Sequence, residues 1–64
     1  MELQSYYNKN VTIIDIDGQT FSGVVSDYFH ADENESGKES IILESKDGEL
    51  TEFEENEIKE IIIN

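Results

Sequence analysis

Residues 11–25, VTIIDIDGQTFSGVV, contain the features that decide the fold. A β-branched run precedes Asp17-Gly18, and a second strand-like segment follows it. Asp-Gly between two such runs is a strong signal of a β-hairpin, because both residues tolerate the positive φ angles of a tight turn. Gly23 interrupts the second segment, and a glycine inside a strand usually marks a bulge or a sharp bend. The stretch therefore predicts two antiparallel strands, Asn10–Ile16 and Gln19–Phe29, the second of them bent.

The rest of the chain repeats this pattern with shorter segments. Short β-branched runs alternate with polar residues and are separated by turn-forming sequences. One of these turns is a second Asp-Gly pair, Asp47-Gly48, and another is the polar segment Glu55-Asn56-Glu57. Three further strands are predicted: Ser40–Ser45, Glu49–Glu54 and Ile58–Ile63.

The segment ahead of the first strand has a different pattern. Glu2–Asn8 is predicted to form one or two helical turns, with Leu3, Tyr6 and Tyr7 facing the body of the domain. Five short strands joined by tight turns in 64 residues predict one all-β domain over 1–64. The expected architecture is a small, strongly bent five-stranded barrel with a short N-terminal helix.

This order of elements resembles a known family. LQSYYNKNVTIIDIDGQTFSGVV, residues 3–25, is similar to the beginning of Sm-like (Lsm) barrels, which have a short helix, a hydrophobic strand and an Asp-Gly turn. They also place an aromatic residue two positions before a bending glycine, as Phe21 is placed before Gly23 here. IKEIII, residues 58–63, resembles their closing strand. The resemblance implies the Sm fold and a ring in which strand four of one subunit pairs with strand five of the next.

The uridine-binding residues of the Sm-like family are not matched in this chain. The family uses an Asp and an Asn around the turn between strands two and three, and an Arg-Gly pair before strand five. Here Phe29 falls where the Asp belongs, and Ser40 is nearest to the Asn. Glu54 and Glu55 take the place of Arg-Gly. Because a carboxylate replaces the arginine, we do not expect direct nucleic-acid binding.

The chain is strongly acidic. Sixteen Asp and Glu residues face four Lys and no Arg, for a formal net charge of −12. This charge disfavours binding to phosphate backbones and to anionic membranes. It either keeps a small protein soluble or imitates nucleic-acid phosphates and so occupies a basic protein partner. The sequence contains no Cys and begins with no charged-then-apolar leader, so we expect a cytoplasmic protein.

Two short motifs resemble parts of catalytic or metal-binding sequences. Asp15-Ile16-Asp17-Gly18 after a hydrophobic run resembles the start of haloacid-dehalogenase-type phosphatases, but the chain has no room for their α/β sheet. Asp32–Leu43 matches several positions of an EF-hand calcium loop, yet Leu43 falls where a bidentate Glu is required. His30 is the only imidazole. We therefore expect a non-enzymatic protein without catalytic residues, metal site or cofactor.

Two groups of residues are candidates for partner binding. Tyr28-Phe29-His30 is the one aromatic cluster beside a loop, and it either packs in the barrel mouth or forms a docking surface. In the last strand, we expect three isoleucines to share the buried face and Ile62 to point outward beside a free strand edge. The three inward residues of that strand are Ile58, Ile61 and Ile63.

Together these observations predict a binding or scaffolding module that acts through protein–protein contacts, with self-association into a homo-oligomer first. Two alternatives remain open. One is an acidic inhibitor that occupies a basic nucleic-acid-binding protein. The other is a ring that binds a small molecule or nucleotide between its subunits, using the aromatic cluster and turn residues.

Overall fold

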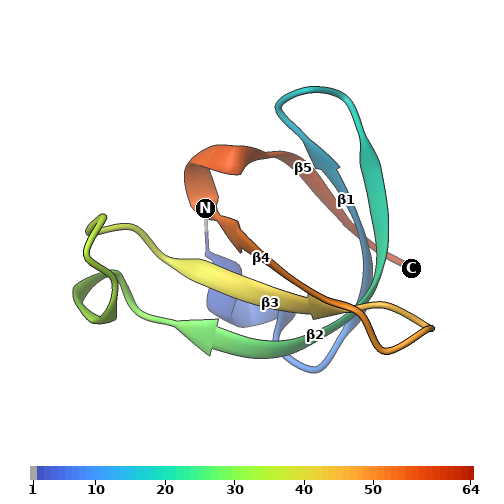
Figure 1. Ribbon diagram of the computed structural model, residues 1–64, viewed down its shortest axis with the longest axis horizontal. Coiled ribbons are helices and arrows are strands. Elements are labelled where there is room, and N and C mark those ends of the chain that lie inside the picture. Colours follow the sequence, from blue (N-terminus) through green and yellow to red (C-terminus); the bar gives the residue numbers. More distant parts are fainter. Residues whose placement is uncertain (1) are drawn as a thin grey trace.

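The computed structural model describes residues 2–64, and its five strands form one antiparallel sheet (Figure 1). The hydrogen-bonded order is β4-β3-β2-β1-β5, so β4 and β5 are the two edges. Figure 1 shows that the sheet curls strongly but stays open between these edges. The predicted all-β, five-stranded fold is confirmed, with each boundary within one residue of the prediction. The strands are β1 (Asn10–Asp15), β2 (Thr20–Phe29), β3 (Ser40–Glu44), β4 (Leu50–Glu54) and β5 (Ile58–Ile63).

Short 3-10 helices supply the remaining regular structure. They are η1 (Leu3–Tyr6), η2 (Ala31–Glu33) and η3 (Glu55–Glu57). The predicted N-terminal helix is thus a single 3-10 segment, η1, which buries Leu3 completely and packs Tyr6 against the core. The expectation that Tyr7 faces the body is wrong: its side chain is 51% exposed, because the helix ends before it. Within residues 2–64, no helix has the length and hydropathy needed to cross a bilayer.

The core lies on the concave side of the sheet, and every strand contributes to it. Alternate residues of a strand point to opposite faces, so each strand buries one apolar set. The Phe21 ring of β2 meets the Phe53 ring of β4 edge to face, with the ring centroids 5.2 Å apart. These two strands are not neighbours in the sheet, so the contact requires the bend. The buried core residues are Leu3, Val11, Ile13, Val25, Ile41, Leu43, Phe53 and Ile58.

The first Asp-Gly turn is a three-residue loop and not the predicted two-residue turn. The Asp15 N–H donates to the Gln19 carbonyl at 2.9 Å, and the Gly18 N–H donates to the Asp15 carbonyl at 2.9 Å. Gly18 has φ +82°, whereas Asp17 is not in the left-handed region. This is the pattern of a type I turn followed by a left-handed glycine. Ser45–Glu49 repeats it, with Gly48 at φ +85°.

Asp15 has a structural role in this loop. Its Oδ1 accepts hydrogen bonds from the backbone N–H groups of Asp17 and Gln19, both at 2.9 Å. A short acidic side chain that binds nearby N–H groups in this way stabilises a turn. The chain then continues directly into β2, as the hairpin interpretation of this motif predicts.

Gly23 lies where β2 and β3 approach too closely to admit a side chain. A β-carbon on Gly23 would overlap the carbonyl group of Glu44. The predicted bulge does not occur at Gly23, which pairs regularly with Val11. Instead, the register shifts at Ser26, which is skipped in the pairing of β2 with β3, and at Lys59, which is skipped in the pairing of β1 with β5. Bulges increase the local twist and bend of a strand.

We expect Gly23→Val to lower the free energy of unfolding by more than about 2 kcal/mol, because β2 or β3 must move to make room. Gly37→Ala is the matched control. Its β-carbon would meet nothing within 4 Å, but its φ of +75° would make alanine cost about 1 kcal/mol. Urea unfolding of both variants checks the ranking, and equal stabilities would contradict this account of the bend.

Candidate functional site: the open edges of the sheet

The two edge strands present unpaired backbone and exposed apolar side chains. Each edge strand pairs with one neighbour only, β4 with β3 and β5 with β1. A free edge of this kind carries unsatisfied N–H and C=O groups and can pair with another chain. Leu50 at the start of β4 is 63% exposed, and Ile62 near the end of β5 is 44% exposed. Both edges therefore combine open hydrogen-bonding groups with an apolar side chain.

The isoleucines of β5 are divided between the two faces of the sheet. Ile58 is buried, and Ile61 packs against the core. The bulge at Lys59 accounts for this spacing, because it lets residues three apart face the same side. The predicted outward position of Ile62 is confirmed, but the predicted burial of Ile63 is wrong, since its side chain is 54% exposed. Ile63 pairs with the fully buried Val11, but it lies on the edge strand β5, so its own side chain stays open to solvent.

The end of β5 is held to β1 by a chain of polar contacts. The Asn64 backbone N–H donates to the Asn10 carbonyl at 2.9 Å, and the Asn64 side-chain amide donates to the Asn10 side-chain carbonyl at 2.8 Å. Thr12 donates to the Asn64 side chain at 3.0 Å, and its hydroxyl lies 2.9 Å from that of Ser22. These contacts position Ile62, which is opposite Thr12 in the register.

The edge strand β4 has an acidic outer face. Phe53 is buried and Thr51 is half-buried on the inner side. By alternation, Leu50, Glu52 and Glu54 face outward. Charged side chains on an edge strand limit uncontrolled pairing. The sequence pattern had not singled out Leu50, because a leucine at a strand end is usually buried with its neighbours.

The predicted aromatic cluster is split by the alternation of β2. Tyr28 packs against the core, and its ring meets the His30 ring edge to face with the centroids 4.9 Å apart. Phe29 is half-buried and, being the next residue of the strand, points to the opposite face. The structure therefore brings Tyr28 and His30 together but places Phe29 elsewhere. Ile62 lies on β5, two strands away from β2 in the sheet.

Carboxylates surround the hydroxyl group of Tyr28. Partial burial raises the pKa of this hydroxyl above its ordinary value. A side-chain hydrogen bond with Glu39 raises the pKa further, and so do the negative charges of Glu39, Glu33 and Glu55. A hollow beside this group is lined by Glu2, Gln4, Ser5, Tyr28 and Glu39. The Tyr28 ring is thus one wall of an acidic surface.

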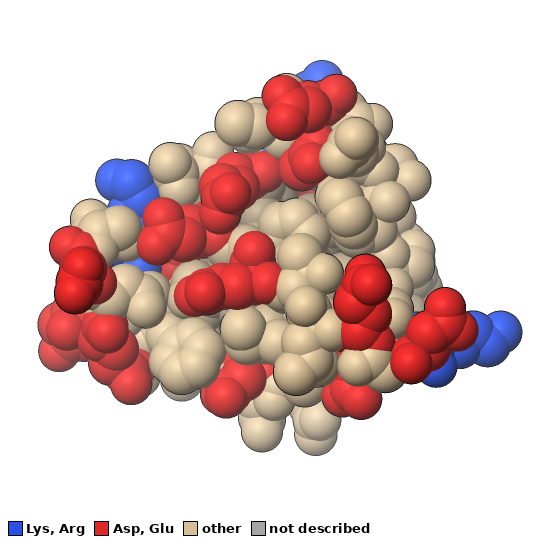
Figure 2. All heavy atoms as spheres, viewed as in Figure 1, with Lys and Arg blue, Asp and Glu red and all other residues tan. Residues whose placement is uncertain are grey.

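Acidic side chains also lie elsewhere on the molecule's visible face, between larger areas of other residues. Figure 2 shows them spread over this face, with lysines only at its margins. Among residues 2–64, no group of three or more His, Asp or Glu side chains is arranged to hold a metal ion.

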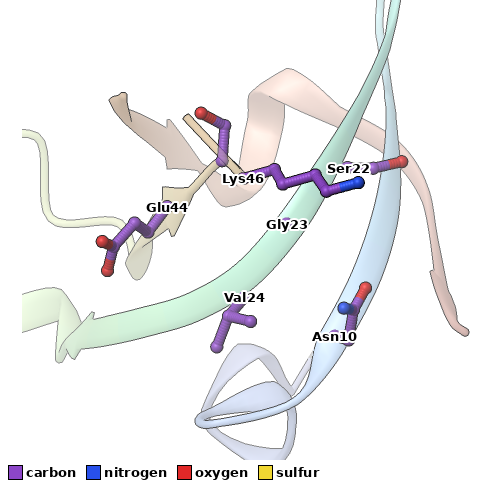
Figure 3. Close-up of a pocket in the computed structure, with 7 residues that line it drawn as sticks. Asn10, Ser22, Gly23, Val24, Glu44 and Lys46 are labelled. Carbon is purple, nitrogen blue, oxygen red and sulfur yellow. The ribbon is translucent and has the colours of Figure 1, made fainter. Parts of the chain in front are cut away.

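Another hollow lies where β2 passes β3 at Gly23. It has a volume of about 650 Å³ and is open to solvent. In Figure 3 the Lys46 side chain extends over β2 at Gly23 toward Ser22, whereas the Glu44 carboxylate points away. The aromatic cluster does not line this hollow. The small-molecule alternative would combine the aromatic cluster with turn residues. In this structure the hollow at Gly23 is lined by the turn residues Ser45 and Lys46 but lies apart from the aromatic cluster.

The positions that the Sm-like resemblance aligns with the uridine pocket do come together. Phe29, Ser40 and Glu54 lie opposite one another across β2, β3 and β4. Ser40 is fully buried, with its hydroxyl 3.0 Å from the donating Asn34 side-chain amide. Glu54 accepts a hydrogen bond from the Ser36 hydroxyl at 2.6 Å. These side chains hold the loop between β2 and β3 against the sheet.

No protein-family model matches this sequence, and neither a curated protein nor a solved structure matches the chain.

The raised pKa of Tyr28 gives a testable alkaline dependence. Because the folded-state pKa lies above the unfolded value of about 10, the stabilisation from the protonated hydroxyl is complete below that pH. It is lost as the pH rises through the folded-state pKa. We expect Tyr28→Phe to remove a tyrosine that ionises above pH 10 from an ultraviolet titration, and Glu39→Gln to bring the ionisation of Tyr28 to lower pH.

Tyr7→Phe is the control for this titration, because Tyr7 is exposed. An unchanged late ionisation in Tyr28→Phe would show that another tyrosine carries the raised pKa.

Proposed function

We propose that this chain is an Sm-like, non-enzymatic module that acts through protein–protein contacts and assembles with copies of itself. The observation that carries the proposal is the pair of unpaired edges, β4 and β5, each with an exposed apolar side chain. The Sm-like resemblance implies pairing of these same two strands between subunits. The arrangement of the single chain is compatible with that assembly, because both edges are free.

Edge pairing would satisfy groups that the isolated chain leaves to solvent. Backbone N–H and C=O groups on a free edge have no partner within the sheet. Main-chain hydrogen bonds provide the affinity when one strand is added to the edge of another sheet, and side-chain pockets provide the specificity. A head-to-tail contact of two different edges leaves one free edge at each end, so it builds a closed ring or an open chain.

Charge acts against the assembly. Each copy carries a formal net charge of −12, so bringing copies together raises their mutual repulsion. Salt screens this repulsion, and the Debye length falls from about 10 Å at 0.1 M to about 4 Å at roughly 0.5 M. Self-association should therefore strengthen with ionic strength.

Ile62→Lys should abolish or strongly weaken assembly, because it places a charge beside the free edge of β5. Val24→Lys is the matched control: Val24 is also β-branched and exposed, but it lies on the central strand β2. Light scattering at about 0.05 M and about 0.5 M salt measures both variants. A native chain that stays monomeric at both salt concentrations would refute the proposal.

The acidic surface around Tyr28 supports a second candidate function, the docking of a basic protein segment. Three carboxylates act on the Tyr28 hydroxyl, and its ring borders the acidic hollow. Lysine and arginine side chains bind both carboxylates and aromatic faces. This candidate includes the inhibition of a basic nucleic-acid-binding protein.

Calorimetry with an arginine-rich peptide tests this second candidate. We expect salt-sensitive binding that Glu39→Gln weakens and Glu60→Gln, on β5, leaves unchanged. Equal effects of the two substitutions would show that only the net charge attracts the peptide.

A further inference from the structure

We infer that Tyr7, Tyr28 and Asp27 form a recognition site for an arginine side chain of a partner protein. The two tyrosines provide aromatic walls, and the Asp27 carboxylate pairs with the guanidinium group. This inference rests on the second candidate function proposed above, the docking of a basic protein segment. It specifies which basic side chain such a segment must carry and where on this chain that side chain binds.

A hollow of about 430 Å³ lies between the N-terminal segment and strand β2, and it is open to solvent. Its walls are Gln4 and Tyr7 from the N-terminal segment and Asp27 and Tyr28 from β2. The acidic hollow described above shares Gln4 and Tyr28 with it, so the two hollows are neighbours on one surface. Neither of them is lined by a lysine of this chain. Two tyrosines and several carboxylates therefore border a surface that carries no cation of its own.

The backbone at Tyr7 is fixed, although the side chain is 51% exposed. The Tyr7 N–H donates to the Gln4 carbonyl at 3.1 Å, and the N–H of the next residue, Asn8, donates to the Val25 carbonyl of β2 at 2.8 Å. Asn8 has φ +69°, a left-handed conformation in which asparagine is enriched. An exposed tyrosine on an anchored backbone loses little conformational entropy when a ligand binds, and such aromatic residues often anchor protein contacts.

Strand β2 extends beyond its β1 partner at this hollow. Within residues 2–64, the hydrogen-bonded pairing of β2 on that side ends at Val25. The Tyr28 backbone N–H lies beyond this point and donates to Asp27 Oδ1 at 2.9 Å, which places the carboxylate beside the uncovered part of the strand. The Tyr28 hydroxyl interacts with Glu39, and the side chain packs against the core, so the ring is held as well. Both groups are in place before a ligand arrives, which lowers the cost of binding.

The hollow combines the two kinds of group that bind a guanidinium ion. This planar cation stacks on aromatic rings and forms paired hydrogen bonds with a carboxylate, whereas the ammonium group of lysine is more strongly hydrated and acts as a point charge. The net charge of −12 attracts any cation to the surface, but the tyrosines make the site selective for the guanidinium ion. The chain itself contains no Arg, so the arginine must belong to another protein.

Calorimetry with a pair of short peptides tests the inference. The peptides have acetylated and amidated ends and the same glycine-rich sequence, but one carries arginines where the other carries lysines. Their charges are therefore equal, and only the chemistry of the cation differs. At about 0.05 M salt, where surface charges are weakly screened, we expect the arginine peptide to bind about three- to tenfold more tightly than the lysine peptide.

Substitutions in the walls of the hollow locate the site. Tyr7→Leu should reduce the preference for arginine to about twofold or less, whereas Tyr7→Phe keeps the ring and should keep the preference. Asp27→Asn should weaken binding of the arginine peptide, while its remaining oxygen can still accept from the Tyr28 N–H. Asp17→Asn, in the exposed first loop, makes the same change of net charge and should have little effect. Thermal unfolding of each variant checks that the fold is intact.

The outcomes separate this inference from the proposed function. If neither peptide binds, both the docking of a basic segment and the arginine site are refuted. If the two peptides bind equally well, or if Tyr7→Leu keeps the full preference for arginine, the docking of a basic segment stands and the arginine site is overturned. Equal effects of Asp27→Asn and Asp17→Asn would show that net charge alone attracts the peptide and would also overturn the site.

Discussion

The contact between the backbone of β3 and Gly23 of β2 is the constraint on which the rest of the structure depends. The Glu44 carbonyl occupies the space that any side chain at Gly23 would need. Because the two strands come so close there, β2 can turn from one half of the molecule into the other while it stays paired with both neighbours. The bend brings Phe21 over Phe53, although their strands are not adjacent. One sheet can therefore enclose a core that usually needs two layers.

This way of enclosing a core leaves the edges open. The segment between β4 and β5 is the short helix η3, which joins the edges covalently without pairing them. The inner faces of both strands are committed to the core, through Phe53 on β4 and Ile58 on β5. Only the outer faces and the free backbone groups remain for binding. In the proposed assembly, the acidic side chains on β4 would oppose the approach of a second acidic strand.

Local chemistry predicted most of the fold from the sequence, and long-range packing decided the rest. The Asp-Gly pairs located both hairpins, because only a few residues tolerate a left-handed turn position. The two-residue turn predicted at Asp17-Gly18 was wrong, because the loop there has three residues. The side chain of Asp15 stabilises this longer loop by accepting hydrogen bonds from two backbone N–H groups. The bulges at Ser26 and Lys59 carry no glycine or other local signal and depend on how the sheet closes around the core. Tyr7 and Ile63 were both predicted to face the body of the domain, but their side chains are exposed. The alternation of apolar and polar residues cannot show which side chains at the end of an element the rest of the chain covers. For the candidate site, the outward position of Ile62 followed from periodicity, whereas the exposure of Leu50 became evident only from the structure.

The pairing of β5 with β1 has a consequence for the order in which the protein folds. The other three strand pairs join neighbours in the sequence, whereas Val11 must pair with Ile63 at the far end of the chain. Long-range pairs cost more loop-closure entropy and form late, so β5 is expected to dock after the hairpins. Strand β5 is also held by one neighbour only. Its amide hydrogens should exchange with solvent sooner than those of β2, which lies between two strands. Of the two strands with a free edge, β5 is thus the one whose local stability an added strand would increase more.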